Sequence, residues 1–195
     1  MGLSFYVDKN VLIPRPDTEV LAEYVIENCH GKILDIGTGS GALSVSIAKY
    51  GKDVSVFACD ISQEALNIAM RNSSTNDASV TFFHCDILKD ELKEKYNVIV
   101  SNPPYIRSDV ILTLDKNVKD FEPSLALDGG NDGLIFYRTI TEKAYNALTE
   151  DGILAYEIGF DQAKEVSDIM SPLFKEIKVL KDLSGNDRVV TGIKK

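Results

Sequence analysis

Cysteine and histidine are scarce in this 195-residue sequence, which contains three cysteines and two histidines. Cys29, Cys59 and Cys85 are odd in number and form no C-x-x-C pair, which excludes a disulfide framework and the usual spacing of a zinc site. Reduced thiols are typical of a cytoplasmic protein. His30 and His84 stand far apart with no partner motif. We therefore expect no bound metal and a cytoplasmic location.

Long hydrophobic runs and an excess of positive charge are also missing. No apolar run approaches the roughly 18 residues that a membrane-spanning helix needs, and the N-terminus lacks a basic stretch followed by an apolar one. We expect no membrane association. Lysine and arginine number 21 against 30 aspartates and glutamates, which gives a net charge of −9. Such a surface lacks the general attraction to phosphate on which nucleic-acid binding depends, so no extended nucleic-acid interface is expected.

What is present is typical of one globular domain, with 44% hydrophobic and 26% charged residues. Short apolar runs alternate with helical patterns from residue 18 onward, which predicts an α/β domain with a mostly parallel sheet. We expect residues 1–17 to form a short β-hairpin and a linker, and residues 18–195 to form the main domain. The expected strands are 32–36, 54–59, 80–84, 96–101, 152–158, 174–180 and 188–192. The expected helices are 18–30, 42–50, 62–73, 133–148 and 161–170.

A strand, a glycine-rich turn and a helix start follow one another in Asp35-Ile36-Gly37-Thr38-Gly39-Ser40-Gly41. Glycines let the backbone turn sharply and approach a ligand closely, and the helix N-terminus offers free N–H groups. The pattern also fits the loose dinucleotide fingerprint when Ala42 is counted. However, the charge of Asp35 would repel a pyrophosphate, and the loop has no basic residue to offset it. A carboxylate here suits a ligand with an ammonium group, such as the methionine part of S-adenosylmethionine.

Two further carboxylates follow the next two strands. Asp60 lies 19 residues after Gly41, where a carboxylate can accept hydrogen bonds from both ribose hydroxyls. Asp86 is placed to accept from an adenine amine, and Ile61 is placed to lie against the base. The alternatives are that Asp60 caps the following helix and that Asp86 is a turn residue. The predicted cofactor site comprises Asp35, Gly37, Thr38, Gly39, Gly41, Asp60, Ile61, Asp86, Ile87 and Asn102.

The tetrapeptide Asn102-Pro103-Pro104-Tyr105 directly follows the fourth predicted strand. Ligands bind outside the carboxyl ends of parallel strands, so this segment faces the nucleoside site. The prolines fix the backbone and remove N–H donors, which leaves the Pro103 carbonyl free to accept. With the side-chain oxygen of Asn102, it can hold both hydrogens of a planar NH₂ group. The alternative is a proline-rich turn in which Asn102 bonds its own backbone.

Two acceptors on an NH₂ group suit methylation of an amide or aryl amine. Such a nitrogen is a poor nucleophile because its lone pair is delocalised. Holding it in line with a methyl donor supplies much of the barrier reduction, and fixed dipoles supply more. No general base is required first, since the nitrogen loses its proton easily after methylation. Tyr105 is expected to form a flat wall of the slot. The predicted catalytic residues are Asn102, Pro103 and Tyr105.

These residues together resemble the HemK/PrmC family of protein-glutamine methyltransferases over nearly the whole chain. The matching segments are 12–19 (LIPRPDTE), 35–41 (DIGTGSG), 101–106 (SNPPYI), 121–123 (FEP), 126–130 (ALDGG) and 182–188 (DLSGNDR). The resemblance implies a Rossmann-like S-adenosylmethionine-dependent methyltransferase fold whose seven-stranded, mostly parallel sheet has an antiparallel last strand. It also implies methylation of the glutamine in the Gly-Gly-Gln loop of a peptide-chain release factor, the expected partner.

The resemblance carries residue roles with it. Asn102 and the Pro103 carbonyl would hold the glutamine amide, Asp35 and the glycines the methionine end, Asp60 the ribose, and Asp86 the adenine. Arg15 would line the site, with a structural salt bridge as the alternative. The implied substrate-binding residues are Pro14, Arg15, Pro16, Asn102, Pro103, Pro104, Tyr105, Glu122 and Pro123.

One departure from the family and three rival functions remain. Family members usually carry a helical docking domain before the Pro-Arg-Pro segment, whereas 13 residues precede Pro14 here. The nearest rival function is methylation of an adenine exocyclic amine in RNA or DNA, with the base flipped into the slot. Residues 102–133 hold three basic against six acidic residues, which is a poor track for phosphates. A nicotinamide oxidoreductase and a non-catalytic binding module are the other two.

Overall fold

The computed structural model describes residues 1–111, 113 and 123–195. Of Ser124 it describes the backbone only. Its strands are β1 (Gly31–Ile36), β2 (Val54–Asp60), β3 (Val80–His84), β4 (Tyr96–Ser101), β5 (Leu148–Glu157), β6 (Phe174–Lys181) and β7 (Asp187–Lys194). Its helices are α1 (Thr18–Asn28), α2 (Ala42–Tyr50), α3 (Gln63–Thr75), α4 (Ser108–Ile111), α6 (Ile135–Ala147) and α7 (Ala163–Met170), with a 3-10 turn η1 (Ser124–Ala126).

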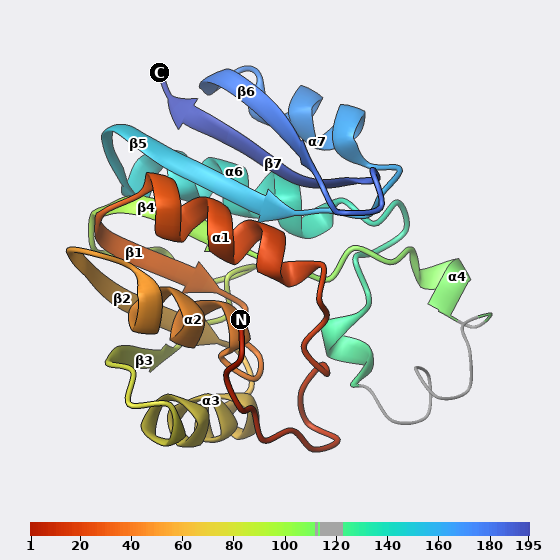
Figure 1. Cartoon of the computed structure of the whole chain (residues 1–195). Helices are drawn as coiled ribbons and strands as arrows, with labels where there is room; N and C mark the ends of the chain where they lie inside the picture. The colour runs from red at the N-terminus through yellow and green to blue at the C-terminus, as the bar shows by residue number, and fades with distance from the viewer. Residues whose placement is uncertain (112, 114–122) are drawn as a thin grey trace.

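The strands form one seven-stranded sheet in the order β3-β2-β1-β4-β5-β7-β6. The pairs among β1 to β5 are parallel, while β7 is antiparallel to both β5 and β6. The predicted Rossmann-like sheet with an antiparallel last strand is therefore confirmed. Helices α1, α2 and α3 lie on one face of this sheet, and α6 and α7 lie on the other (Figure 1).

Two hydrophobic cores hold the three layers together, because successive strand residues point to opposite faces. In β1, Ile33 belongs to the core that includes residues of α1 and α2, whereas Leu34 belongs to the core that includes residues of α6 and α7. In β4, Val98 and Ile99 divide between the two cores in the same way. Central strands that are buried on both sides are thus continuously apolar, as the sequence pattern indicates.

The sheet order places a crevice at the carboxyl ends of β1 and β4. From β1 the chain builds outward through β2 and β3, then returns to form β4 on the other side of β1. Ligands of open α/β sheets bind where the order reverses in this way. The glycine loop after β1 and the tetrapeptide after β4 therefore meet at one edge of the sheet.

The predicted hairpin at the N-terminus is wrong, since residues 1–17 contain no strand. The turn that suggested it does exist: the backbone N–H of Val11 donates to the carbonyl of Asp8 at 3.3 Å, and Asn10 donates to the Asp8 side chain at 2.8 Å. The segments on either side of this turn do not pair with each other. Side chains of another element form hydrogen bonds with the backbone of the first segment instead.

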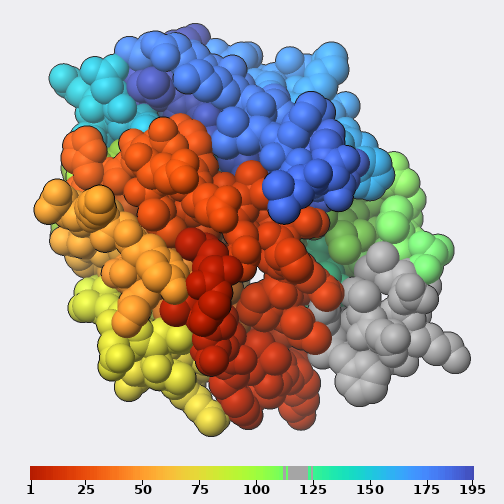
Figure 2. All heavy atoms as spheres, in the orientation of Figure 1, coloured from red at the N-terminus to blue at the C-terminus, as the bar shows by residue number. Residues whose placement is uncertain are grey.

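Asn72 of α3 and Asn76, the C-cap residue of that helix, form the backbone hydrogen bonds that a partner strand would form. The Asn72 side chain accepts from the N–H of Tyr6 at 2.8 Å and donates to its carbonyl at 2.9 Å, and Asn76 does the same for Ser4 at 3.2 and 2.8 Å. Asn72 also donates to the carbonyl of Ser40 in the glycine loop at 2.8 Å. The N-terminal segment consequently lies along the surface beside α3 (Figure 2).

The connection after β4 begins and ends in a short stem. Ile106 and Asp128 form a parallel bridge, in which the N–H of Ile106 donates to the carbonyl of Leu127 at 3.0 Å and the N–H of Gly129 donates to the carbonyl of Ile106 at 2.8 Å. Ser108 donates to the carbonyl of Gly130 at 3.0 Å. The long loop predicted over 106–130 is thus tied together at its base.

Within the described ranges, no helix combines the length and apolar character needed to cross a bilayer. Over those same ranges, no group of three or more His, Cys, Asp or Glu side chains is arranged to hold a metal ion.

Candidate active site

A cavity of about 420 Å³ lies at the carboxyl ends of the central strands, beneath the N-terminal segment. This volume is within the range of small-molecule and cofactor sites. Among the predicted site residues, the cavity is lined by Pro14, Arg15, Asp35, Gly37, Thr38, Gly39, Asp60, Ile61, Asp86, Ile87, Asn102, Pro103, Pro104 and Pro123. The predicted cofactor and substrate residues therefore share one cavity.

Four predicted residues are not among those that line this cavity. Gly41 and Tyr105 line neither this cavity nor a second, smaller one of about 200 Å³, and Pro16 lines only the second. Glu122 falls outside the described residues. Arg15 lines both cavities. It is therefore positioned for either of the two roles that the sequence leaves open.

The glycine loop leaves room where side chains would stand. Gly37 and Gly39 have positive φ angles of 73° and 55°, and a Cβ built on either would meet no heavy atom within 4 Å. The positive φ angles favour glycine at both positions, and the lack of side chains leaves the floor of the cavity open. Gly41 serves packing instead, since its Cβ would lie 3.2 Å from the Cα of Ala69 in α3.

Asp35 is a buried carboxylate beneath this loop, with 1% of its surface exposed. The Thr38 hydroxyl donates to its Oδ2 at 2.7 Å and lies 2.7 Å from the hydroxyl of Ser44. The pKa of Asp35 is raised to about 6. Burial causes the rise, and the hydrogen bonds from Thr38 and Ser44 offset part of it. Hydroxyls rather than a cation surround the carboxylate in the part of the chain described, so a bound ammonium would supply the missing charge.

Asp60 connects the glycine loop to the end of β2. Its Oδ2 accepts from the N–H of Gly39 at 2.8 Å and its Oδ1 accepts from the N–H of Ser62 at 2.9 Å. The cap of α3 is Ser62, whose side chain accepts from the N–H of Ala65 at 3.1 Å. Asp60 is thus not the helix cap, and each of its oxygens keeps a lone pair for a ligand hydroxyl. Burial raises the pKa of Asp60.

Asp86 is more fully occupied. Lys89 lies 2.7 Å from its Oδ2, and the N–H of Leu88 donates to its Oδ1 at 3.1 Å. The ion pair with Lys89 lowers the pKa of Asp86. These contacts agree with the turn-residue alternative, although Asp86 also lines the cavity. A ligand amine at this carboxylate would share it with Lys89.

Asn102 stands at the end of β4, on the opposite side of the cavity from Asp60. The buried hydroxyl of Ser101 donates to the carbonyl of Ile36 at 2.7 Å, which fixes the ends of β4 and β1 to each other. The Asn102 side-chain nitrogen donates to the hydroxyl of Thr18 at 3.3 Å. The alternative of an asparagine bonded to its own backbone is thus not what the structure shows.

Tyr105 does not form the predicted wall of the slot. Two glycines pack against its backbone: a Cβ on Gly129 would lie 2.8 Å from the Cα of Tyr105, and one on Gly133 would lie 2.4 Å from its carbonyl oxygen. The Gln162 side chain donates to that same oxygen at 3.1 Å. Burial raises the pKa of the Tyr105 hydroxyl. The Tyr105 side chain packs against the hydrophobic core instead of lining the cavity, and these contacts hold its backbone.

Sequence reasoning missed the apolar walls of the cavity. These come from Phe136 and Ile140 of α6, from Leu125, and from Val11 and Leu12 of the N-terminal segment. The apolar face of the helix expected over 133–148 was a usable signal, because such a face packs onto the sheet near the strand ends. Thr18, Ser62 and Lys89 also line the cavity.

Comparison with known proteins gives consistent results. Residues 15–118 match the family model described as Methyltransferase small domain. The chain is 47% identical to the release factor glutamine methyltransferase of Clostridium acetobutylicum, in an alignment that covers 100% of this chain and 71% of that protein. It is 45% identical to the protein of the same name from Flavobacterium psychrophilum, covering 97% and 70%.

Solved structures agree with the architecture. A methyltransferase from Pyrococcus furiosus superposes with a TM-score of 0.72 at 21% identity, and the match covers 99% of this chain and 89% of that one. The ribosomal protein L11 methylase of Lactobacillus delbrueckii superposes with a TM-score of 0.64 at 22% identity, covering 95% and 82%. At these identities the similarity establishes the fold.

Proposed function

We propose that this chain, which belongs to the release factor glutamine methyltransferase family, transfers a methyl group from S-adenosylmethionine to the side-chain amide of a glutamine in a peptide-chain release factor. One observation carries the proposal: Asp35, a buried carboxylate with no cation beside it among the described residues, shares a cavity with Asn102 and Pro103. The first suits an ammonium group and the others suit an NH₂ group, and a methyl transfer to an amide needs both in one place.

The donor set fits S-adenosylmethionine. Asp35 would pair with the ammonium of the methionine part, and the open space over Gly37 and Gly39 lets the backbone approach the ligand. Asp60 has lone pairs left for the ribose hydroxyls, and Ile61 and Ile87 offer apolar surface to the base. When bound, S-adenosylmethionine supplies an electrophilic methyl group on a positively charged sulfur.

The tetrapeptide after β4 would hold the glutamine. The Pro103 carbonyl and the Asn102 side-chain oxygen accept the two amide hydrogens, which orients the nitrogen and favours its pyramidal form. Phe136 and Leu125 add apolar surface to the cavity, and fixed dipoles are more effective beside apolar surface than in water. Positioning and fixed dipoles, rather than proton abstraction, would therefore lower the barrier.

The test is transfer of a labelled methyl group from S-adenosylmethionine to purified release factor, followed by mapping of the labelled residue. We expect label on one glutamine. Asn102→Ala should abolish turnover while cofactor binding stays within about twofold, because Asn102 acts on the amide. Asn28→Ala, an exposed asparagine at the end of α1, is the matched control.

Total RNA and DNA are offered in parallel reactions. Label on nucleic acid alone would identify an adenine methyltransferase and overturn the proposal. Full turnover by Asn102→Ala would remove Asn102 from the mechanism.

A further inference from the structure

Glu157 is a buried carboxylate that the mechanism above does not use. It is the last residue of β5, beside the end of β4, and 2% of its surface is exposed. Its Oε2 has no hydrogen-bond partner within the described residues. It does not line the cavity, whereas its neighbours Asn102 and Thr18 do. A buried carboxylate directly behind the residue that would hold the substrate amide calls for a physical explanation.

The hydrogen bonds around Glu157 connect it to the site. The Asn102 side-chain nitrogen donates to the hydroxyl of Thr18. Burial raises the pKa of Glu157, and hydrogen bonding from Thr18 and from Asn102 to its ionised form opposes that rise. Thr18 is the first residue of α1, so three elements that are distant in sequence, α1, β4 and β5, meet at this point.

We propose that Glu157 is a positioning residue, which acts on Thr18 and Asn102 to fix the Asn102 amide with its oxygen toward the cavity. The inference rests on the proposed function, since it explains how the acceptor needed for the substrate NH₂ group is kept in place. Without such a constraint, an asparagine side chain can rotate by half a turn and present its own NH₂ group instead.

The constraint follows from counting donors and acceptors. An ionised carboxylate only accepts hydrogen bonds, so the single hydroxyl hydrogen of Thr18 is directed to Glu157. The Thr18 oxygen can then only accept, and the Asn102 nitrogen is its donor. The Asn102 oxygen is left for the cavity. Protonated Glu157 could instead donate to Thr18, whose hydroxyl could then donate to the Asn102 oxygen and reverse the amide.

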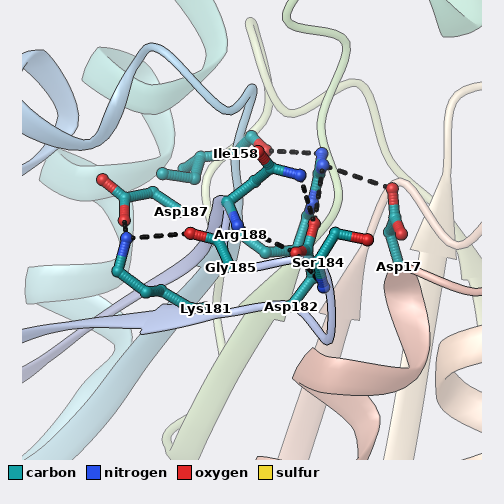
Figure 3. A network of polar contacts seen from close by, with 9 residues as sticks. Asp17, Ile158, Lys181, Asp182, Ser184, Gly185, Asp187 and Arg188 are labelled. Atoms are coloured by element: carbon teal, nitrogen blue, oxygen red, sulfur yellow. Dashed lines mark hydrogen bonds and ion pairs between the residues drawn. The ribbon is translucent and has the colours of Figure 1, made fainter.

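The charges around Glu157 set when it ionises. The charge of Arg188 in β7 acts on Glu157, but the Arg188 guanidinium is engaged by Asp17 and Asp182, each at 3.2 Å, and by the carbonyl of Ile158 at 3.4 Å (Figure 3). Arg188 Nε itself has no partner in the described part of the chain. Burial raises the pKa of Glu157 to about 7, while Thr18, Arg188 and Asn102 oppose the rise and Asp17 adds to it. The other ionisable groups that act on Glu157 are Tyr105, after β4, and Tyr137, of α6.

The kinetic test compares wild type with Glu157→Gln and Thr18→Val, with Thr18→Ser as the variant that keeps the hydroxyl. Glu157→Gln and Thr18→Val should lower kcat by roughly 10–100-fold, the range seen when a supporting hydrogen bond is lost. The Kd for S-adenosylmethionine should stay within about twofold. Thr18→Ser should be impaired far less than Thr18→Val. The wild-type kcat should fall below about pH 7, and this acid limb should be missing in Glu157→Gln.

A second measurement needs no substrate. The side-chain NH₂ resonances of Asn102, assigned by their loss in Asn102→Ala, should shift with a midpoint near pH 7 in wild type and stay constant in Glu157→Gln. Asn102 resonances that are the same in wild type and Glu157→Gln at about pH 8.5 would overturn the inference, as would full kcat in both Thr18→Val and Glu157→Gln. If the resonances titrate but no release factor is methylated, the positioning role stands and the proposed substrate is wrong. Should Glu157→Gln fail to fold, the Thr18 pair and the wild-type titration decide alone.

Discussion

Replacing Asp35 with asparagine is expected to stabilise the free protein while it destroys cofactor binding. The carboxylate is buried among hydroxyls, and burial raises its pKa from 3.8 to about 6. One pKa unit corresponds to about 1.4 kcal/mol, so at high pH the ionised carboxylate lowers the free energy of unfolding by about 3 kcal/mol. Asparagine keeps an acceptor for Thr38 but forms a weaker hydrogen bond than a carboxylate, a loss of about 1 kcal/mol. The net gain at pH 8 is therefore about 2 kcal/mol.

The gain should depend on pH in a definite direction. Because the pKa of Asp35 is higher in the folded state, the folded protein holds this proton more tightly. The stability associated with protonated Asp35 is complete below about pH 4 and is lost as the pH rises through 6. At pH 5 the wild type recovers about 1.4 kcal/mol relative to pH 8, so the advantage of Asp35→Asn shrinks to about 0.6 kcal/mol.

Urea unfolding without cofactor measures the difference in free energy of unfolding between Asp35→Asn and wild type at pH 5 and at pH 8. A gain of 2 kcal/mol raises Tm by about 4–8 °C for a chain of this length. Asp77→Asn is the matched control, since Asp77 is exposed and should give the same small effect at both pH values. Calorimetry should show that Asp35→Asn no longer binds S-adenosylmethionine. An equal effect of Asp35→Asn at the two pH values, or a destabilised variant at pH 8, would refute the reasoning.

Three other substitutions test separate contacts. Asp60→Ala should weaken the binding of S-adenosylmethionine by about 1–3 kcal/mol in calorimetry, because the ribose hydroxyls lose their acceptor; unchanged affinity would show that Asp60 only orders the glycine loop. Asn72→Ala should lower the free energy of unfolding by about 2–4 kcal/mol, because backbone groups of Tyr6 and Ser40 lose their partners, and limited proteolysis should then cut first in the N-terminal segment; a fragment pattern like that of wild type would contradict this. Gly129→Ala places a Cβ 2.8 Å from the Cα of Tyr105 and should displace the tetrapeptide, so turnover should fall by about 100-fold. The control variant Gly185→Ala, in the exposed β6–β7 turn, should keep wild-type turnover. Equal turnover in the two variants would argue against this packing.

Much of the site could be predicted because its residues lie at the ends of strands. Asp35, Asp60 and Asn102 each belong to or directly follow a strand that its apolar composition identifies. Parallel strands bring their carboxyl ends to one edge of the sheet, so topology alone places these side chains together. For the same reason the alternation of strands and helices was sufficient for the order of elements from α1 to β7.

The remaining features depend on contacts between distant segments. The hairpin prediction relied on a real turn at Asp8, but nothing local shows that Asn72 satisfies the backbone of Tyr6 better than a neighbouring strand would. Tyr105 was assigned to the wall because it follows the prolines, whereas its side chain packs against the hydrophobic core. Glu157 belongs to an apolar strand, and its effect on Asn102 is visible only when β4 and β5 are side by side.

The stem at Ile106 and Asp128 has a consequence for how members of such a family could diverge. It anchors both ends of the connection beside the tetrapeptide, so the length between residues 113 and 123 is decoupled from the geometry of Asn102. Doubling the length of a loop whose ends are fixed costs only about 0.6 kcal/mol in closure entropy. Changes of length between the two halves of the stem should therefore leave the position of Asn102 unchanged, which makes this connection the place to exchange sequence when specificity is to be redesigned.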